Sequence, residues 1–280
     1  MPLARALTAT RTARPRRAPM KAVRQEEGAL FIGSIGKCFQ VLEALNAAGR
    51  AVGLKELAEI SGLDRSAVQR IAHTLRVLGY LRQDASTRAF TLSGRMLEFG
   101  HTVLATDRVC ERAQPHLEAL NKRTGETVNL MELEGDEIVY VARFPSLHAV
   151  SVDLHVGSRL PAFCTAAGRA ILSRMEEADA LALLKSARRV AMTPRTLTDL
   201  AKLRKAIGQA RLLGYALNDQ EAFVGDLSVA APLLDRKGHP VGAVNVAVPT
   251  PRWQTPDLLD QLVPQLLKTA AAINKELKGP

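Results

Sequence analysis

The chain has 280 residues, of which 47% are hydrophobic and 24% are charged, and its formal net charge is +10 at pH 7. This length is enough for one large domain or two ordinary ones. No stretch approaches the roughly 18 uncharged apolar residues of a membrane-spanning helix, which excludes an integral membrane protein of that kind. The three cysteines never occur in a CxxC spacing, which argues against a disulfide framework or a structural zinc site and favours the reducing cytoplasm.

Positive charge is concentrated in the first third of the chain. Residues 1–30 contain seven basic and two acidic residues, residues 31–100 contain nine and six, and residues 101–280 contain 22 and 20. A concentrated basic excess favours a polyanionic partner, so we expect a nucleic-acid-binding N-terminal part and a nearly neutral C-terminal part. Because residues 1–30 hold little large apolar surface to bury, they are predicted to form a disordered basic arm, within which Met20 offers an alternative start.

The region 31–92 is predicted to form a winged helix-turn-helix domain. Apolar residues spaced three and four apart predict helices over 34–48 and 54–60, and a third helix that starts after Asp64, whose side chain can cap free backbone amides. A polar turn between two short strands then predicts a hairpin over 80–92. The side chains expected to face the core are Ile35, Cys38, Phe39, Leu42 and Leu45 in the first helix and Val68, Ile71, Leu75 and Leu78 in the third.

The opposite face of the third predicted helix is rich in hydrogen-bond donors. Arg and Gln side chains can make paired hydrogen bonds to purine edges in the major groove, and Ser66 with the helix N-terminus can bind phosphate. The alternative is a solvated helix face, but the capped turn before the helix and the hairpin after it favour DNA reading. The expected DNA-binding residues are Arg65, Ser66, Gln69, Arg70, His73 and Arg76 on the helix, with Arg82 and Arg88 beside the hairpin as phosphate or minor-groove contacts.

The rest of the chain is predicted to hold a linker helix over 93–112 and an α+β, sensor-like domain over 113–280, in which hairpinned strands carry helices on one side. The expected strands are 127–133, 137–143, 150–155, 215–218, 227–233 and 241–248, and the expected helices are 115–123, 165–175, 178–185, 200–213 and 256–277.

The run LKELAEISGLDRSAVQRIAHTLRVLGY, which ends at Tyr80, resembles the helix-turn-helix of the IclR family of bacterial transcriptional regulators. The resemblance extends from about Gly33 to the C-terminus. It implies an N-terminal winged helix-turn-helix, a linker helix and a C-terminal GAF-like effector-binding domain. The stretches GSRLPAFCTAAGRAIL from Gly157 and GYALNDQE from Gly214 are similar to that effector domain, and most resemble the branch that controls aromatic-acid catabolism through protocatechuate and the β-ketoadipate pathway.

The resemblance implies that a small organic acid, expected to be aromatic, binds in the C-terminal domain. Thr165 begins a predicted helix, where its hydroxyl and the free helix amides can receive a carboxylate. The branch usually has Gly-Leu-Arg-Ser where this chain has Gly225-Asp-Leu-Ser228, so an arginine expected near the pocket is missing. The alternative is that these are buried turn and core positions. The expected effector-binding residues are Leu160, Ala162, Cys164, Thr165, Ala166, Asp219, Glu221, Leu227, Ser228 and Asn245.

No catalytic residue, metal ligand or cofactor is predicted. Cys164 could be imagined as a nucleophile, but nothing in the sequence indicates a base within reach, and cysteine is commonly a packing residue. His148 and His155 are seven residues apart on expected strands, so period-two alternation places them on opposite faces.

The sequence therefore predicts a cytoplasmic transcriptional regulator that binds a palindromic double-stranded operator as a homodimer or homotetramer. A small organic acid in its C-terminal domain is expected to change DNA binding, and RNA polymerase is a further expected partner. Two alternatives stay open. One is an enzyme that acts on a small organic acid and carries an accessory winged-helix domain, and the other is a constitutive architectural DNA binder with an empty sensor domain.

Overall fold

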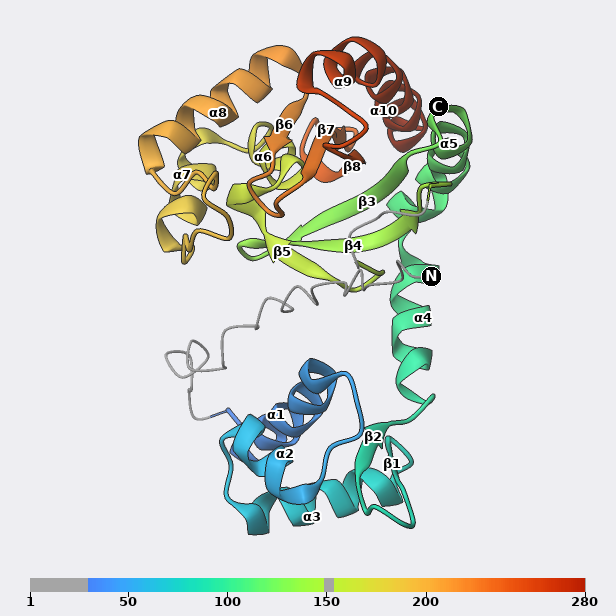
Figure 1. Ribbon diagram of the computed structural model, residues 1–280, viewed down its shortest axis with the longest axis vertical. Helices are drawn as coiled ribbons and strands as arrows, with labels where there is room; N and C mark the ends of the chain where they lie inside the picture. The colour runs from blue at the N-terminus through green and yellow to red at the C-terminus, as the bar shows by residue number, and fades with distance from the viewer. Residues whose placement is uncertain (1–29, 149–153, 280) are drawn as a thin grey trace, which may run out of the picture. The chain divides into compact units, whose positions relative to one another are not determined.

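The structure is a computed structural model that describes residues 30–148 and 154–279 (Figure 1). It has the predicted α+β class, with a helix-turn-helix followed by a curled antiparallel sheet with helices. The described chain divides into two compact units between Val103 and Leu104. The expected basic arm, apart from Leu30, and most of the strand expected at 150–155 lie outside the described residues.

The described part of the first unit contains a two-stranded antiparallel sheet, three helices before its strands, and most of α4 (Met96–Thr106). The helices and strands that pack together are α1 (Gly33–Ala48), α2 (Leu54–Ser61), α3 (Arg65–Val77), β1 (Leu81–Gln83) and β2 (Phe90–Leu92). Asp64 caps α3 as predicted, because its Oδ1 accepts a hydrogen bond from the Ala67 amide at 2.8 Å. Gly79 adopts a φ of 83° after α3, a conformation that favours glycine. Local capping signals therefore set the limits of the third helix.

The core of this unit differs from the predicted one at the ends of α1 and α3. Ile35 and Phe39 are 51% and 55% exposed, so the packed part of α1 is its second half. Leu78 is also 51% exposed, because it follows the last residue of α3 and has left the inward stripe of the helix. The prediction that these three side chains face the core is wrong. The buried side chains of α1 and α3 are Val41, Ala44, Leu45, Val68, Ala72 and Leu75.

The six-stranded sheet that follows has the order β5-β4-β3-β8-β7-β6, and all of its neighbouring strands are antiparallel. Its strands are β3 (Thr127–Glu134), β4 (Glu137–Phe144), β5 (Arg159–Pro161), β6 (Ala216–Asp219), β7 (Asp226–Leu234) and β8 (Pro240–Pro249). The other helices are α4 (Met96–Thr106), α5 (Arg108–Thr124), a 3-10 turn at 162–164, α6 (Ala166–Leu172), α7 (Glu177–Ser186), α8 (Leu200–Leu213), α9 (Thr255–Gln261) and α10 (Val263–Lys278).

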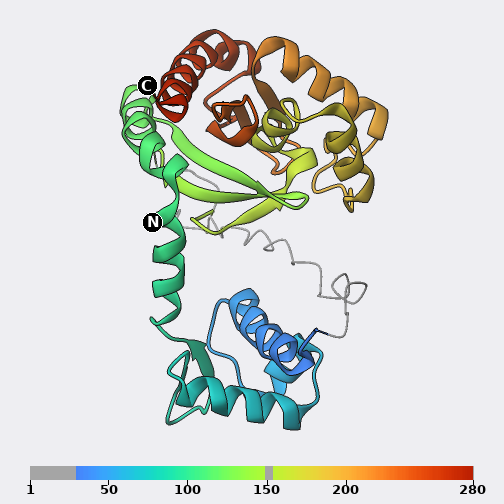
Figure 2. The same cartoon turned by 180° about the vertical axis from the view of Figure 1, so that it is seen from behind.

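The two faces of this sheet pack against different helices. Helices α5 and α10 lie side by side on one face, which we call the outer face (Figures 1 and 2). Helix α6 packs on the other face, which we call the inner face. Alternation along β7 sends Leu227 and Val229 to the outer cluster and Ala230 to the inner one. A side chain of β7 or β8 can therefore be assigned to a face from its neighbours.

Two predicted helices are each divided in the structure. The helix predicted over 93–112 is interrupted at Asp107, whose Oδ1 accepts hydrogen bonds from the Val109 and Cys110 amides at 2.8 and 3.1 Å. This cap starts a new helix, α5, so the helix predicted at 115–123 is only its second half. The pattern over 256–277 likewise divides into α9 and α10, because Pro264 has no amide to continue the first helix. Strand β5 was not predicted. Within residues 30–148 and 154–279, no helix is long and apolar enough to cross a membrane.

A pair of carboxyl groups adjoins the start of α5. Oδ2 of Asp107 is buried and has no hydrogen-bond partner while both groups are ionised. Glu132 on β3 lies beside it, and burial, followed by the charge and hydrogen bonding of Asp107, raises the pKa of Glu132 to about 7. A proton on Glu132 would supply the donor that Asp107 lacks.

We expect this pair to make folding stability fall as the pH rises. The folded state holds the Glu132 proton more tightly than the unfolded state does. The stabilisation that this proton gives to the folded state is therefore complete below the ordinary glutamate pKa, and it is lost as the pH rises to about 7. Replacing Glu132 with Gln should therefore stabilise the protein by about 1 kcal/mol at about pH 8, a value reduced for partial solvent exposure, and by much less at about pH 5. Urea unfolding followed by the fluorescence of Trp253, the single tryptophan, measures this difference. An equal effect at both pH values would contradict it.

Candidate DNA-binding surface and effector site

The start of α3 is organised by Asp64. Its Oδ1 accepts hydrogen bonds from the Ser66 hydroxyl at 2.6 Å and from the Ala67 amide at 2.8 Å. These two bonds hold the pKa of the Asp64 carboxyl below its usual range. The Ser66 hydroxyl therefore helps to cap the helix, a role that the sequence did not predict. In this arrangement its proton is not directed at a phosphate.

The face of α3 opposite its core is open to solvent. All eight predicted DNA-binding residues are exposed, and on α3 they lie away from the buried Val68, Ala72 and Leu75. In the described part of the chain, the side chains of Arg65, Arg70 and Arg76 form no ion pair with an acidic group, so their donors are available. The exposed set is Arg65, Ser66, Gln69, Arg70, His73, Arg76, Arg82 and Arg88.

The hairpin after α3 has a tightly hydrogen-bonded turn. Oδ1 of Asp84 accepts bonds from the backbone amides and the hydroxyls of Ser86 and Thr87, at distances of 2.6 to 3.1 Å. These bonds hold the pKa of Asp84 well below its usual range. Arg88 follows the turn with a φ of 59°, and its amide bonds to the Asp84 carbonyl at 3.0 Å. The turn thus fixes the backbone that carries the exposed Arg88 side chain.

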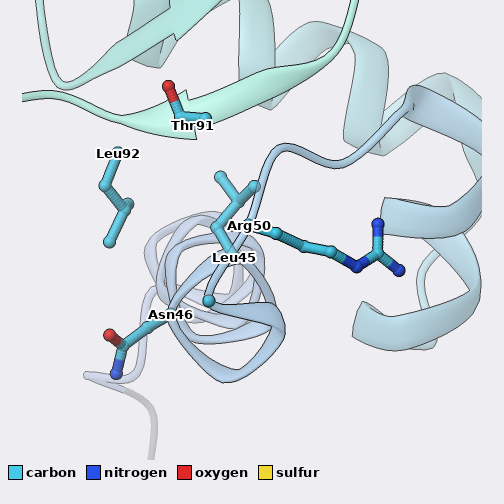
Figure 3. Close-up of a pocket in the computed structure, with 6 residues that line it drawn as sticks. Leu45, Asn46, Arg50, Thr91 and Leu92 are labelled. Carbon is cyan, nitrogen blue, oxygen red and sulfur yellow. The ribbon is translucent and has the colours of Figure 1, made fainter. Parts of the chain in front are cut away.

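A shallow hollow of about 240 Å³ lies between the end of α1 and β2 (Figure 3). Its basic side chain, Arg50, forms a two-pronged ion pair with Glu56 of α2, so this charge is already compensated. We therefore assign no ligand to the hollow. Its lining residues are Leu45, Asn46, Gly49, Arg50, Thr91 and Leu92.

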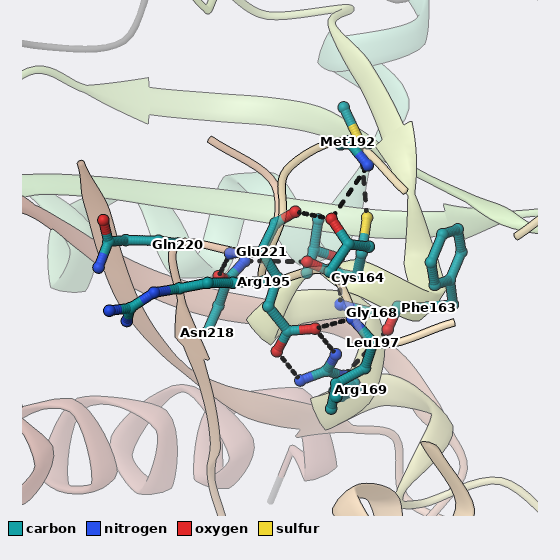
Figure 4. A network of polar contacts seen from close by, with 12 residues as sticks. Phe163, Cys164, Gly168, Arg169, Met192, Arg195, Leu197, Asn218, Gln220 and Glu221 are labelled. Atoms are coloured by element: carbon teal, nitrogen blue, oxygen red, sulfur yellow. Dashed lines mark hydrogen bonds and ion pairs between the residues drawn. The ribbon is translucent and has the colours of Figure 1, made fainter. Parts of the chain in front are cut away.

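In the C-terminal unit, a buried ion pair lies at the centre of the region predicted to bind the effector (Figure 4). Both terminal nitrogens of Arg169 on α6 donate to the Glu221 carboxylate, and the two side chains are 3% and 8% exposed. Glu221 also accepts a hydrogen bond from the Leu197 amide at 2.9 Å, and Nε of Arg169 donates to the Phe163 carbonyl at 2.9 Å. Glu221 is thus satisfied within the protein. Through these bonds Glu221 holds its own loop and the loop that contains Leu197 against α6.

Thr165 has a similar internal role. Its hydroxyl accepts a hydrogen bond from the Gly168 amide at 3.2 Å and faces the Ala162 carbonyl at 3.3 Å. A Cβ at Gly168 would lie only 2.1 Å from that carbonyl oxygen, so glycine is required for this close approach. Burial raises the pKa of the neighbouring Cys164 thiol to about 12, which keeps it protonated. The other predicted residues of this stretch, Leu160, Ala162, Cys164 and Ala166, are buried in the core between α6 and the inner face.

The structure separates two predicted residues from the rest. Leu227 is 2% exposed and packs in the outer cluster, on the opposite side of the sheet from Ser228. Asp219 forms an ion pair with Arg195 at 2.7 Å, and both side chains are largely exposed. The arginine that the family branch carries at position 227 would also start from the outer face. Its absence therefore removes no partner from the inner face, and the expectation that position 227 lies beside the pocket is wrong.

Polar side chains instead gather on the inner face, beside the apolar cluster that packs against α6. Nδ2 of Asn129 donates to Oδ1 of Asn245 at 2.8 Å, and Nη1 of Arg143 donates to Oδ1 of Asn129 at 3.0 Å. Tyr140 also faces inward, where it packs with the α6 cluster. We call Asn129, Tyr140, Arg143, Asp226, Ser228 and Asn245 the inner-face polar set.

A bulge explains how two of these residues share a face. Leu130 pairs with Ala142 and Met131 with Tyr140, so Val141 has no partner on β3. The extra residue shifts the alternation, and Tyr140 and Arg143, three residues apart, both face inward. Sequence reasoning found Ser228 and Asn245 but missed the other four members. The available signal was an isolated polar residue within an apolar strand, as at Asn129 between two buried residues.

The electrostatics connect three members of the inner-face polar set. Burial raises the pKa of the Asp226 carboxyl to about 7, while Arg143 acts to lower it. Burial also raises the pKa of Tyr140, and the charges of Asp226 and Arg143 act on it in opposite directions. The side chains of Tyr140, Asp226 and Ser228 form no hydrogen bond with any residue that the structure describes. They are the polar groups here that a ligand could satisfy.

The exposed donor-rich helix and the separate α+β unit define a winged-helix DNA-binding regulator. Two family profiles match the chain, the IclR helix-turn-helix domain over residues 34–85 and the bacterial transcriptional regulator IclR C-terminal domain over residues 101–275. The Pca regulon regulatory protein of Pseudomonas putida is 34% identical over 250 residues, which cover 89% of this chain and 85% of that protein. The chain belongs to the IclR family of transcriptional regulators. The predicted likeness to the aromatic-acid branch is confirmed, and the relatives are named as regulators, not as enzymes.

Solved structures agree with this family. A Rhodococcus sp. RHA1 protein described as a transcriptional regulator is 34% identical, with a TM-score of 0.77 over 88% of this chain and 98% of that one. The inducer-binding domain of the Acinetobacter transcription factor PobR, solved as a double mutant with 3-hydroxybenzoic acid, is 29% identical, with a TM-score of 0.55 over 59% of this chain and 96% of that one. None of these matches tests individual residues of this chain, so the DNA-binding and effector-binding assignments stay predictions.

Proposed function

We propose that this protein binds a palindromic operator through α3 and changes its DNA affinity when a small aromatic acid occupies the inner face of its C-terminal sheet. The observation that carries the effector site is the inner-face polar set. Its members Tyr140 and Ser228 are buried and Asp226 is partly buried, and none of the three has a described hydrogen-bond partner, although buried polar groups are normally paired. A ligand that supplies their partners would be bound firmly.

The acid would be held by complementary chemistry. Arg143 brings a positive charge to the inner face, and its hydrogen bond to Asn129 fixes the position of the guanidinium. A guanidinium offers paired donors that match a carboxylate. The inner face beside it is lined by the apolar α6 cluster, which suits an aromatic ring. An aromatic acid is further supported by the Pca regulator and by the PobR domain that binds 3-hydroxybenzoic acid.

DNA binding would be carried by the exposed face of α3 in a symmetric assembly. A homodimer, or a homotetramer built from dimers, would present two copies of α3 to two half-sites, which explains why a palindromic operator is expected. The acid can alter this binding only if it has different affinities for the DNA-competent and DNA-incompetent states. The protein would then act on transcription in the cytoplasm, beside RNA polymerase, without catalysing a reaction. If the purified protein converted a candidate acid into a product, the proposal that it is not an enzyme would be wrong.

Removing the cation tests the effector site. We expect Arg143→Met to weaken the binding of 3-hydroxybenzoate by about 10- to 100-fold, because a charge-assisted pair contributes about 1.5–3 kcal/mol. Ser228→Ala should weaken it by about fivefold, through loss of one neutral hydrogen bond. Isothermal titration calorimetry measures both, and DNA affinity without acid should not change.

Arg204→Met is the matched control for this experiment. Arg204 lies exposed on α8, where it pairs with Glu177 at the surface. Its loss should leave acid binding unaltered. If Arg143→Met and Arg204→Met bind the acid equally well, Arg143 is not part of the effector site.

A further inference from the structure

Asp226 has an unusual setting for a carboxylate. It lies two residues before Ser228 on β7, so its side chain starts on the inner face. Its cross-strand partner on β8 is Pro249, which has neither an amide hydrogen nor a polar side-chain atom to donate. No residue within 30–148 or 154–279 donates a hydrogen bond to its carboxylate. Asp226 is partly buried, and an ionised carboxylate with reduced access to water is stabilised when a donor reaches it.

The nearest charged and titratable groups do not meet this need. Tyr140 and Arg143, on β4, share the inner face with Asp226, and each affects it or is affected by it electrostatically. On the neighbouring β8 the opposed residue is Pro249, and on β7 the next inward residue is the neutral Ser228. The inner-face polar set thus holds one cation, Arg143, and one carboxyl group that still needs a donor.

These two groups constrain how an organic acid can lie in the site. The acid's carboxylate is attracted by Arg143 and repelled by Asp226, so it must be held on the Arg143 side. The opposite part of the ligand then lies nearer to Asp226. An unsubstituted ring would present only carbon there and leave Asp226 unsatisfied, whereas a hydroxyl or amino group would donate to it.

We propose that Asp226 determines effector choice, by selecting aromatic acids that carry a hydrogen-bond donor away from their carboxylate over acids that lack one. This inference rests on the proposed effector site and adds the residue that discriminates within it. Sites with a buried polar group reject ligands that leave that group unpaired much more strongly than apolar pockets reject a small change in size. Asp226 is therefore a specificity-determining residue and not a general contributor to affinity.

The proposal also predicts a dependence on pH. Near pH 8 the Asp226 carboxyl is ionised more than half of the time, because its pKa is about 7, and an acid that brings no donor to it is disfavoured most. Near pH 6 the carboxyl is mostly neutral, and the cost of leaving it without a donor is smaller. The affinity for a hydroxy acid divided by the affinity for the unsubstituted acid should therefore rise with pH. Tyr140 does not titrate in this range, because its pKa is raised.

The test compares benzoate with 3-hydroxybenzoate and 4-hydroxybenzoate by calorimetry on the full chain. The wild type should bind one of the two hydroxy acids at least about tenfold more tightly than benzoate. Asp226→Leu should remove this preference, by weakening hydroxybenzoate binding and strengthening benzoate binding. Asp226→Asn retains an acceptor oxygen, so it should keep part of the preference and lose the dependence on pH. Asp260→Asn, at an exposed position on α9, is the matched control and should behave as the wild type does.

The possible results separate the role of Asp226 from the existence of the effector site. If the wild type binds all three acids equally, or if Asp226→Leu weakens all three alike, the role of Asp226 is overturned while the effector site stands. If the wild type binds none of them, the proposed class of effector is overturned as well. Thermal unfolding of each variant, followed by Trp253 fluorescence, identifies a variant that fails to fold, and Asp226→Asn then decides the question.

Discussion

Replacing Arg65 and Gln69 together with alanine should abolish the preference of this protein for its operator over random DNA. Both side chains lie exposed in the first half of α3, the part of a recognition helix that enters the major groove. Each bidentate contact to a base contributes about 1–3 kcal/mol of discrimination, so the loss of two in each half-site should reduce the specificity ratio by about 100-fold or more. Non-specific affinity should persist, since Arg70, Arg76 and Arg82 remain for phosphate contacts.

The experiment needs an operator and a control. DNA selected from a random pool by the wild-type protein supplies the operator, and competition with unselected DNA at fixed salt measures the preference. Arg82→Ala is the control, because a phosphate contact from the hairpin carries no sequence information. That variant should weaken all DNA binding alike and reduce the slope of log affinity against log salt by about one. Unchanged preference in the Arg65/Gln69 double variant would exclude α3 as the reading helix.

The second large effect concerns the ion pair between Arg169 and Glu221. Replacing Arg169 with Met should destabilise the protein by about 3–5 kcal/mol, because it leaves the Glu221 carboxylate buried without its cation. The carboxylate could then keep only its bond to the Leu197 amide. Urea unfolding followed by Trp253 fluorescence reports this loss, since Trp253 belongs to the outer cluster of the same unit.

Two further variants show whether burial is the cause. Arg195→Met removes an exposed pair with Asp219 and should cost at most about 1 kcal/mol. Replacing both Arg169 and Glu221 by apolar residues should recover much of the lost stability, because no unpaired charge then remains in the interior. Equal stability of Arg169→Met and Arg195→Met would show that the buried pair does not stabilise the fold.

Local structure could be predicted where neighbouring residues decide it. The helix predicted over 200–213 has those limits in the structure, because Asp199 caps its start and Gly214 ends it in a left-handed conformation. Asp64 and Gly79 mark α3 in the same way. The limits of α4 and α5 differ from the prediction because such a cap lies between them. Asp107 is this cap, and the single helix predicted over 93–112 therefore corresponds to α4 and the start of α5.

The candidate effector site could be predicted only in part. The resemblance directed attention to Ser228 and Asn245, which do lie on the inner face. It also included Leu227, although alternation along β7 sends neighbouring residues to opposite faces, so a whole run cannot line one pocket. Glu221 was expected to meet the ligand, but Arg169, 52 residues away in sequence, already occupies it. No local pattern indicates such a distant partner.

By itself, then, the sequence determined the class of fold, the exposed donor-rich face of α3 and the family, because periodicity, caps and motifs are properties of adjacent residues. Only the tertiary structure decided which polar groups meet on the inner face. Tyr140 and Arg143 share that face because a bulge at Val141 changes the alternation, and the bulge exists only in the pairing of β4 with β3. Among the residues that the structure describes, none donates to Asp226, and β8 brings Pro249, which has no donor, opposite it. Strand register is a long-range property, and it places the chemistry of this site.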